Sequence, residues 1–214
     1  MMFTGIIEET GRVAAVRKSQ KAAQLDIRAE KILSDVRNGD SIAVNGVCLT
    51  VTSHTQAVFT ADVMPETISR STLSRLKAGM PVNLERAMPA NGRFGGHLVT
   101  GHIDGTGTIR QIRKEENAVW YHIRASEPLL RGIVEKGSVA VDGISLTVAA
   151  VDKREFLVSV IPHTSGHTSL PAKREGDAVN IENDCIGKYV ERFLSCERAG
   201  SGVVTQEYLL KNGF

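Results

Sequence analysis

Short runs of alternating apolar and polar residues recur about every 10 to 15 residues, and most are rich in valine, isoleucine and threonine. Glycine, asparagine, aspartate and proline separate the runs, which is the pattern of antiparallel strands joined by turns. The runs are GRVAAVRK (11–18), AQLDIRA (23–29), DSIAVNG (40–46), VCLTVTS (47–53), VFTADVM (58–64), PVNLERA (81–87), GTIRQIRK (107–114), VWYHIRA (119–125), GSVAVDG (137–143), ISLTVAA (144–150), FLVSVIP (156–162) and AVNIEND (178–184). No long helical pattern separates consecutive runs, so the sequence argues against a parallel α/β sheet.

The second half of the chain repeats the first. VNGVCLTV (44–51) returns as VDGISLTV (141–148) at an offset of 97 residues, and FTGIIEETGRV (3–13) matches VTGHIDGTGTI (99–109) at an offset of 96. A match with one change of offset over about 85 residues is too long to arise by chance. The predicted parts are two homologous domains, residues 1–96 and 97–186, and a tail, residues 187–214.

Six strands in each half leave exposed edges unless the sheet closes. A small Greek-key barrel removes those edges, because its first and last strands pair. We therefore predict an all-β protein of two tandem six-stranded antiparallel Greek-key barrels with a C-terminal α-helix. A short helical turn is also expected after the proline of each half, at ETISRSTLSRL (66–76) and HTSGHTSL (163–170).

The tail changes from strand to helix periodicity. Its apolar residues recur at helical spacing after Asp184, which could cap the helix start; they are Ile186, Tyr189, Val190, Phe193 and Leu194. A helix with one apolar stripe buries that stripe somewhere, either by self-association or against the C-terminal barrel. The final TQEYLLKNGF (205–214) reads as another short helical turn.

Composition and charge narrow the class of function. A hydrophobic content of 42% with 23% charged residues is that of an ordinary globular protein and argues against disorder. The net charge of +2 and an aromatic content of 5% do not favour nucleic-acid binding or a base-stacking barrel. No apolar run approaches the roughly 18 residues of a membrane span, and the start lacks a signal-peptide pattern. The cytoplasm is the expected location.

The repeated strand carries the candidate chemistry. Side chains alternate between the faces of a strand, so Cys48 and Thr50 share one face while the neighbouring apolar residues face the core. Ser145 and Thr147 repeat this arrangement in the second half. Both copies keep the polar pattern, which favours two matched binding sites over polar residues that merely face solvent.

The two copies differ where chemistry could differ. Ile6 becomes His102, Cys48 becomes Ser145, Glu66 becomes His163 and Ala87 becomes Asp184. Cys48 is a candidate nucleophile, although a small buried cysteine of the core is the commoner case. Histidine exchanges protons near neutral pH, so His102 is a candidate general acid or base, with a purely structural role as the alternative. Equal binding with unequal chemistry suits two copies of one substrate that play different parts.

Other motifs are missing from the sequence. His97 and His102 lack a third ligand at zinc spacing, and His163 with His167 lies between prolines, so no metal site is expected. GHIDGTGTIR (101–110) has neither a dinucleotide nor a P-loop pattern, and no nucleophile elbow occurs. Cys48, Cys185 and Cys196 form no CxxC pair, so neither a disulfide framework nor a zinc knuckle is predicted.

Several segments together resemble the riboflavin synthase family, alpha chain, across essentially the whole length. They are MFTGII (2–7), NGVCLTV (45–51), NGRFGGHLVTGHIDGTG (91–107), VDGISLTV (141–148) and VIPHTS (160–165). Two departures are an additional Met before the usual start, and Val47 where some members have a second cysteine.

The resemblance implies two Greek-key barrels and a C-terminal helix that gathers three chains into a homotrimer. It implies dismutation of two 6,7-dimethyl-8-ribityllumazine molecules to riboflavin and 5-amino-6-ribitylamino-2,4(1H,3H)-pyrimidinedione by four-carbon transfer, with no cofactor and no metal. In the family, the N-terminal barrel of one chain faces the C-terminal barrel of its neighbour, and a lumazine synthase shell can enclose the trimer. Related lumazine proteins keep the barrels but bind the ligand without turnover, so a non-catalytic lumazine- or flavin-binding protein is the alternative.

The family's functional positions carry over by residue. One lumazine is expected at Gly5, Ile6, Ile7, Cys48, Leu49, Thr50, Asp62, Val63, Met64, Pro65, Glu66 and Thr67. The other is expected at Gly101, His102, Ile103, Lys136, Ser145, Leu146, Thr147, Val160, Ile161, Pro162, His163, Thr164 and Ser165. His102 would remove a proton from the acidic C7 methyl group of one lumazine, and Cys48 would add to C7 of the other or position a nucleophile there. Further positions associated with activity are Phe3, Ser41, His97, Asp142 and Asp184, with Phe3 near the ligand and Ser41, His97, Asp142, Asp184 and Ser145 counted with the catalytic residues.

Overall fold

The computed structural model describes residues 2–18, 23–200 and 210–211. Its first half contains β1 (Glu9–Lys18), β2 (Ala23–Arg28), the 3-10 turn η1 (Lys31–Ser34), β3 (Ser41–Val44), β4 (Val47–His54), β5 (Val58–Val63), α1 (Pro65–Arg70), η2 (Thr72–Arg75) and β6 (Pro81–Arg86). Its second half contains β7 (Gly105–Glu115), β8 (Ala118–Arg124), α2 (Glu127–Arg131), β9 (Ser138–Val141), β10 (Ile144–Val151), β11 (Glu155–Val160), α3 (Pro162–Gly166), η3 (Leu170–Ala172) and β12 (Ala178–Asn183), and α4 (Cys185–Gly200) follows. The short helix α2, whose first turn carries a proline, was not predicted from the sequence.

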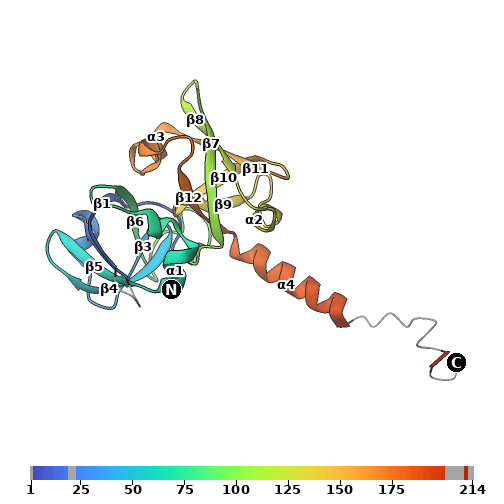
Figure 1. Cartoon of the computed structure of the whole chain (residues 1–214), viewed down its shortest axis with the longest axis horizontal. Coiled ribbons are helices and arrows are strands. Elements are labelled where there is room, and N and C mark those ends of the chain that lie inside the picture. The colour runs from blue at the N-terminus through green and yellow to red at the C-terminus, as the bar shows by residue number, and fades with distance from the viewer. Residues whose placement is uncertain (1, 19–22, 201–209, 212–214) are drawn as a thin grey trace. The chain divides into compact units, whose positions relative to one another are not determined.

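Each half closes into a barrel of six antiparallel strands, which confirms the predicted fold (Figure 1). The first barrel has the order β1-β2-β5-β4-β3-β6, and the second has the equivalent order of β7 to β12. Even the irregularities repeat. The β4–β5 ladder shifts register between Val51 and Ser53, and the β10–β11 ladder shifts between Val148 and Ala150.

Alternation along the strands builds the two cores. In β4, Val47, Leu49 and Val51 are buried, whereas Cys48 is partly exposed and Thr50 is exposed. The same alternation holds along β10, where Ser145 takes the place of Cys48. The predicted strand phase is therefore confirmed in both halves, and burial of the apolar face provides the main stabilisation of each barrel.

The two halves share a small third core and a polar junction. Phe3 and Val99 form an antiparallel bridge and are fully buried together with Ala43 and Ala140. Nearby, the side-chain amide of Asn83 donates to the carbonyl of Asp142, and that of Asn180 donates to the carbonyl of Asn45. Buried polar groups are stable only when paired, so this junction fixes how the two barrels meet.

The helix α4 belongs to a separate compact unit, residues 185–214, whereas both barrels belong to the unit of residues 1–184. The predicted helix is confirmed, and it begins directly after Asp184. Within the described residues, none of the helices combines the length and apolar character needed to cross a bilayer. The helical turn predicted at 205–214 lies mostly outside the described residues; Leu210 and Lys211 are helical.

Candidate functional site

The segment that leads into each barrel, residues 3–7 in the first half and 99–103 in the second, contacts the other barrel. We call these two the entry segments. The carbonyl of Gly101 accepts a hydrogen bond of 2.9 Å from the backbone amide of Cys48, and the carbonyl of Gly5 accepts one of 2.8 Å from the amide of Ser145. Gly101 has a φ of 79°, and a Cβ on it would lie 2.5 Å from the Cβ of Cys48. Only glycine fits this close approach, so any other residue at this turn would push it away from the strand that carries Cys48.

This exchange corrects the grouping expected from the sequence. We expected Gly5 and Ile6 beside Cys48, and the segment 101–103 beside Ser145, but the structure brings together the opposite pairs. The bridge between Phe3 and Val99 draws each entry segment across to the other barrel. The isoleucines that come soon after each glycine are exchanged in the same way: Ile103 packs on the core of the first barrel, and Ile7 packs on the core of the second.

The first site is a pocket of about 190 Å³ beside Cys48. Its lining residues are Val47, Cys48, Glu66, Thr67, Arg70, Ser71, Gly101, His102 and Ile103. Burial raises the pKa of the Cys48 thiol, and a hydrogen bond with Ser41 opposes this only in part. The thiol is therefore neutral near pH 7 and needs a base before it can act as a nucleophile. His102 is exposed and lines the same pocket.

The second site is centred on Ser145. Its hydroxyl oxygen lies 2.7 Å from Nδ1 of His97, and His97 is buried. Burial lowers the pKa of His97, and the negative charge of Asp184 opposes this in part. A neutral imidazole can accept the hydroxyl proton, as in a serine activated by a general base. Among the described residues, the other ring nitrogen, Nε2, has no hydrogen-bond partner.

The remaining predicted residues fall into two groups. Ser41 lies beside Cys48, Asp184 lies near His97, and Glu66 and Thr67 line the Cys48 pocket. Thr50 and Thr147 are exposed on β4 and β10, and the segments 62–67 and 160–165 lead into α1 and α3. The others do not line the Cys48 pocket. Phe3, Leu49 and Leu146 are buried in cores, and Lys136 lies exposed on a turn with a φ of 65°.

Asp142 lies at the junction of the two barrels and does not line the Cys48 pocket. It is fully buried, its Oδ1 accepts a 2.8 Å hydrogen bond from the amide of Asn180, and Lys173 lies 2.8 Å from its Oδ2. Burial raises the pKa of Asp142, and the Lys173 cation and the two hydrogen bonds oppose this rise. These contacts place it where it can hold the barrels together.

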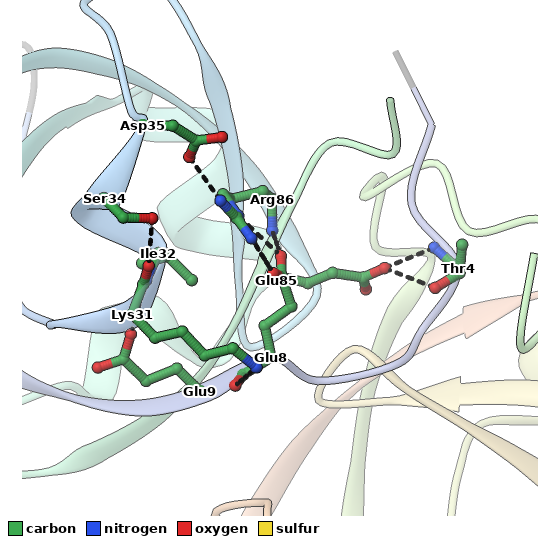
Figure 2. Close-up of polar contacts among 9 residues, drawn as sticks. All are labelled: Thr4, Glu8, Glu9, Lys31, Ile32, Ser34, Asp35, Glu85 and Arg86. Atoms are coloured by element: carbon green, nitrogen blue, oxygen red, sulfur yellow. Dashed lines mark hydrogen bonds and ion pairs between the residues drawn. The ribbon is translucent and has the colours of Figure 1, made fainter. Parts of the chain in front are cut away.

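Two buried glutamates form part of the sites although the sequence did not single them out. Glu85 binds the turn at Thr4, and Glu182 binds the turn at Thr100. The Glu85 turn borders a larger pocket of about 410 Å³, where Arg86 bridges Glu8 and Asp35 (Figure 2). The one signal for these glutamates was their repetition at the same place in both halves.

Within the described residues, no group of three histidine, cysteine, aspartate or glutamate side chains could hold a metal ion. The two sites bring together the thiol of Cys48, the hydroxyl of Ser145 and the imidazoles of His97 and His102, and the Cys48 pocket is also lined by Glu66 and Arg70.

Comparisons with known proteins assign both halves of the chain to one domain family. Residues 4–87 and 100–184 match the family described as lumazine binding domain. The chain is 58% identical over 193 residues to the riboflavin synthase of Actinobacillus pleuropneumoniae, covering 90% of each chain. It is 50% identical over 215 residues to the riboflavin synthase of Bacillus subtilis (strain 168), covering 100% of each.

Solved structures show the same architecture. LumP complexed with riboflavin aligns with a TM-score of 0.79 and 27% identity, covering 85% of this chain and 99% of that chain. LumP complexed with 6,7-dimethyl-8-(1'-D-ribityl) lumazine aligns with a TM-score of 0.78 and 26% identity over the same shares. Two tandem barrels, each matched to the lumazine binding domain family, place the chain in the class of lumazine-binding proteins. From its relatives, this chain belongs to the riboflavin synthase family, whose members are enzymes.

Proposed function

We propose that the chain catalyses the dismutation of two 6,7-dimethyl-8-ribityllumazine molecules. A four-carbon unit passes from one lumazine to the other, so the acceptor becomes riboflavin and the donor becomes 5-amino-6-ribitylamino-2,4(1H,3H)-pyrimidinedione. The enzyme is a transferase. The observation that carries this proposal is the pair of matched sites with unequal groups, Cys48 with His102 and Ser145 with His97. Two copies of one substrate that react differently need such a pair.

At the first site, the exposed imidazole of His102 can take a proton from an acidic carbon of the bound ring. The neutral thiol of Cys48 lies in the same pocket and can add to an electrophilic carbon once a base has removed its proton. The exchanged turn at Gly101 lines the same pocket. We propose that this pocket holds one lumazine.

At the second site, we propose that Ser145 and neutral His97 act together. The imidazole can take the hydroxyl proton, or orient a water molecule, next to the second ring. Asp184 favours the protonated form of His97 and so helps the imidazole to hold that proton. Holding both rings in reactive contact would supply a large part of the rate acceleration.

We also propose that the working enzyme is a homotrimer in the cytoplasm. Taken by itself, α4 carries a stripe at helical spacing formed by Ile186, Tyr189, Val190, Phe193 and Leu194. Such a stripe suits packing against the same helix of other chains. The trimer would bring the N-terminal barrel of one chain to the C-terminal barrel of its neighbour, and a lumazine synthase shell is a candidate enclosing partner.

The alternative function is binding of a lumazine or flavin without turnover, as the complexes of LumP suggest. Cys48, His97 and His102 favour the enzyme, because simple binding needs neither a thiol nor a base beside the ligand. The two functions differ in one measurable product.

The test is to incubate the protein with 6,7-dimethyl-8-ribityllumazine without added cofactor and to quantify riboflavin by chromatography. We expect one riboflavin for every two lumazines consumed. Cys48→Ala should slow turnover by about 100-fold or more, the usual weight of a covalent or proton-transfer group. Cys185→Ala, at the start of α4, is the matched control and should keep full activity per folded protein. Tight binding of lumazine with no riboflavin would leave a carrier protein instead.

A further inference from the structure

Two buried carboxylates hold the exchanged glycine turns. Oε1 of Glu182 accepts hydrogen bonds from the amide of Thr100 at 2.7 Å and from its hydroxyl at 2.8 Å, and Oε2 accepts one from the amide of Gly101 at 3.0 Å. Glu85 repeats all three bonds with Thr4 and Gly5 at the same distances. Figure 2 shows the two bonds with Thr4. Glu85 is 4% exposed and Glu182 is 1% exposed.

A carboxylate suits this position because the three groups that bond to it are all donors. Two backbone N–H groups and one hydroxyl converge on two oxygens that only accept, and such charge-assisted bonds are stronger than neutral ones. A glutamine would direct its own N–H₂ group at a donor and lose at least one bond. Three bonds to two adjacent residues fix the direction in which the glycine carbonyl points.

Each fixed turn acts on the opposite barrel. Glu182 lies in β12 of the second barrel, but the carbonyl of Gly101 binds the amide of Cys48 in the first barrel. His102 follows directly and lines the Cys48 pocket. Glu85 lies in β6 of the first barrel, and its turn ends at the amide of Ser145 in the second barrel.

We propose that Glu85 and Glu182 are positioning residues that act crosswise, Glu182 on the Cys48 site and Glu85 on the Ser145 site. This inference rests on the proposed function in so far as those sites bind the reacting rings. The crossed arrangement makes a specific prediction. Substituting one glutamate should disturb the positions of the groups at the site in the other barrel, the one that does not contain that glutamate. A general loss of stability would affect both sites alike.

The test uses the full chain, with Cys48 as a reporter of its own site. Iodoacetamide modifies the thiol, mass spectrometry of the Cys48 peptide gives the rate, and riboflavin serves as the protecting ligand. Glu182→Gln should raise the ligand-free rate, because the turn no longer covers Cys48 and because the Glu182 charge no longer raises the pKa of the thiol. Thr100→Val keeps that charge and should raise the rate through the turn alone. Glu182→Gln should also raise the riboflavin concentration needed for half protection by about tenfold, the weight of one charge-assisted hydrogen bond.

Glu85→Gln is the mirror control in the same experiment. It should leave both Cys48 measurements within about twofold of wild type, while riboflavin titration shows one binding site per chain weakened. Equal effects of the two glutamine variants on Cys48, or an unchanged Cys48 in Glu182→Gln, would overturn the crossed assignment. Riboflavin that fails to protect Cys48 in the wild type would count against the proposed function. The ligand-free rates of Thr100→Val and Thr4→Val, which keep both glutamate charges, would still decide the crossing.

Gentler variants keep the test valid if a glutamine variant does not fold. Thr100→Val and Thr4→Val remove only the hydroxyl bond to each glutamate and should show the same crossed pattern with a smaller change. Thr100→Ser keeps the hydroxyl and should restore Cys48 protection to the wild-type value. A merely structural role of Thr100 would not distinguish the serine variant from the valine variant at this one thiol.

Discussion

The two barrels are nearly identical where they touch each other and different where they face their pockets. At the junction, the hydrogen bonds of Asn83 and Asn180 correspond one to one, and so do the three bonds of Glu85 and Glu182. At the pockets, a thiol faces a hydroxyl across the repeat. A duplicated protein thus keeps the contacts that both copies need to hold each other and varies the groups that react.

One difference occurs inside the junction itself. Asn45 and Leu76 of the first half correspond to Asp142 and Lys173 of the second, where the two form a buried ion pair. The charge appears together with its partner, as physical chemistry requires, because an unpaired buried carboxylate is costly. The first half therefore shows a neutral version of the same junction contact.

The largest expected effect comes from breaking the likeness at the junction. Gly46 has a φ of 78°, and a Cβ on it would lie 2.7 Å from the backbone nitrogen of Gly143. Gly46→Ala should therefore lower the free energy of unfolding by about 3–5 kcal/mol, from backbone strain and overpacking together. Denaturant unfolding measures the loss.

Gly39→Ala is the matched control, because Gly39 also has a positive φ, 93°, but open space at the Cβ position. It should cost about 1–2 kcal/mol from strain alone. Equal losses for the two variants would mean that the close approach of the halves at Gly46 adds nothing to stability.

Making the two halves alike at the ion pair should have a small net effect on stability, although each single substitution is costly. Lys173→Leu leaves Asp142 buried without a cation and should cost about 3–5 kcal/mol, whereas Asp142→Asn should cost about 1–3 because Lys173, 18% exposed, can reach solvent. The double variant reproduces the pattern of Asn45 and Leu76 and should return to within about 1 kcal/mol of wild type. Chemical denaturation of the four proteins gives the coupling energy.

The activity of the same variants separates two roles for Asp142. If it only joins the barrels, the double variant should make riboflavin at the wild-type rate per folded molecule. A stable double variant without activity would instead support the catalytic role that the family resemblance assigns to this position.

Much of the fold could be predicted because its signals are local and repeated. Alternation along VNGVCLTV and its copy gave the strand phase, so the outward direction of Cys48 and Ser145 was predictable. The apolar stripe predicted α4 in the same way. Closure into barrels followed from strand number and the cost of exposed edges.

The arrangement of the sites was not predictable in the same way, because it depends on contacts between the halves. The bridge between Phe3 and Val99 places each glycine turn against the opposite barrel. An alignment of the two halves of the sequence does not show this exchange. The pairing of His97 with Ser145 joins residues 48 positions apart in different elements. Glu85 and Glu182 lie at repeated strand positions, but only the structure shows that their carboxylates face the turns.

The smallest effect should come from titrating the one buried histidine of the second site. Burial lowers the pKa of His97 in the folded state below its ordinary value of 6.5, so the unfolded chain binds the proton more tightly. Stability from this group is present above pH 6.5 and is lost as the pH falls through the lowered folded pKa.

Two buried carboxyl groups change the free energy of unfolding with pH in the opposite direction. Glu85 and Asp142 have raised pKa values, so their contribution to stability is lost as the pH rises from about 4. The difference between wild type and His97→Gln isolates the histidine: the unfolding free energy of the wild type should fall relative to the variant between pH 7 and pH 5. His54→Gln, at an exposed position, is the control. A difference that stays flat would mean that the folded protein binds the proton of His97 as tightly as the unfolded chain does, and that burial does not favour the neutral imidazole beside Ser145.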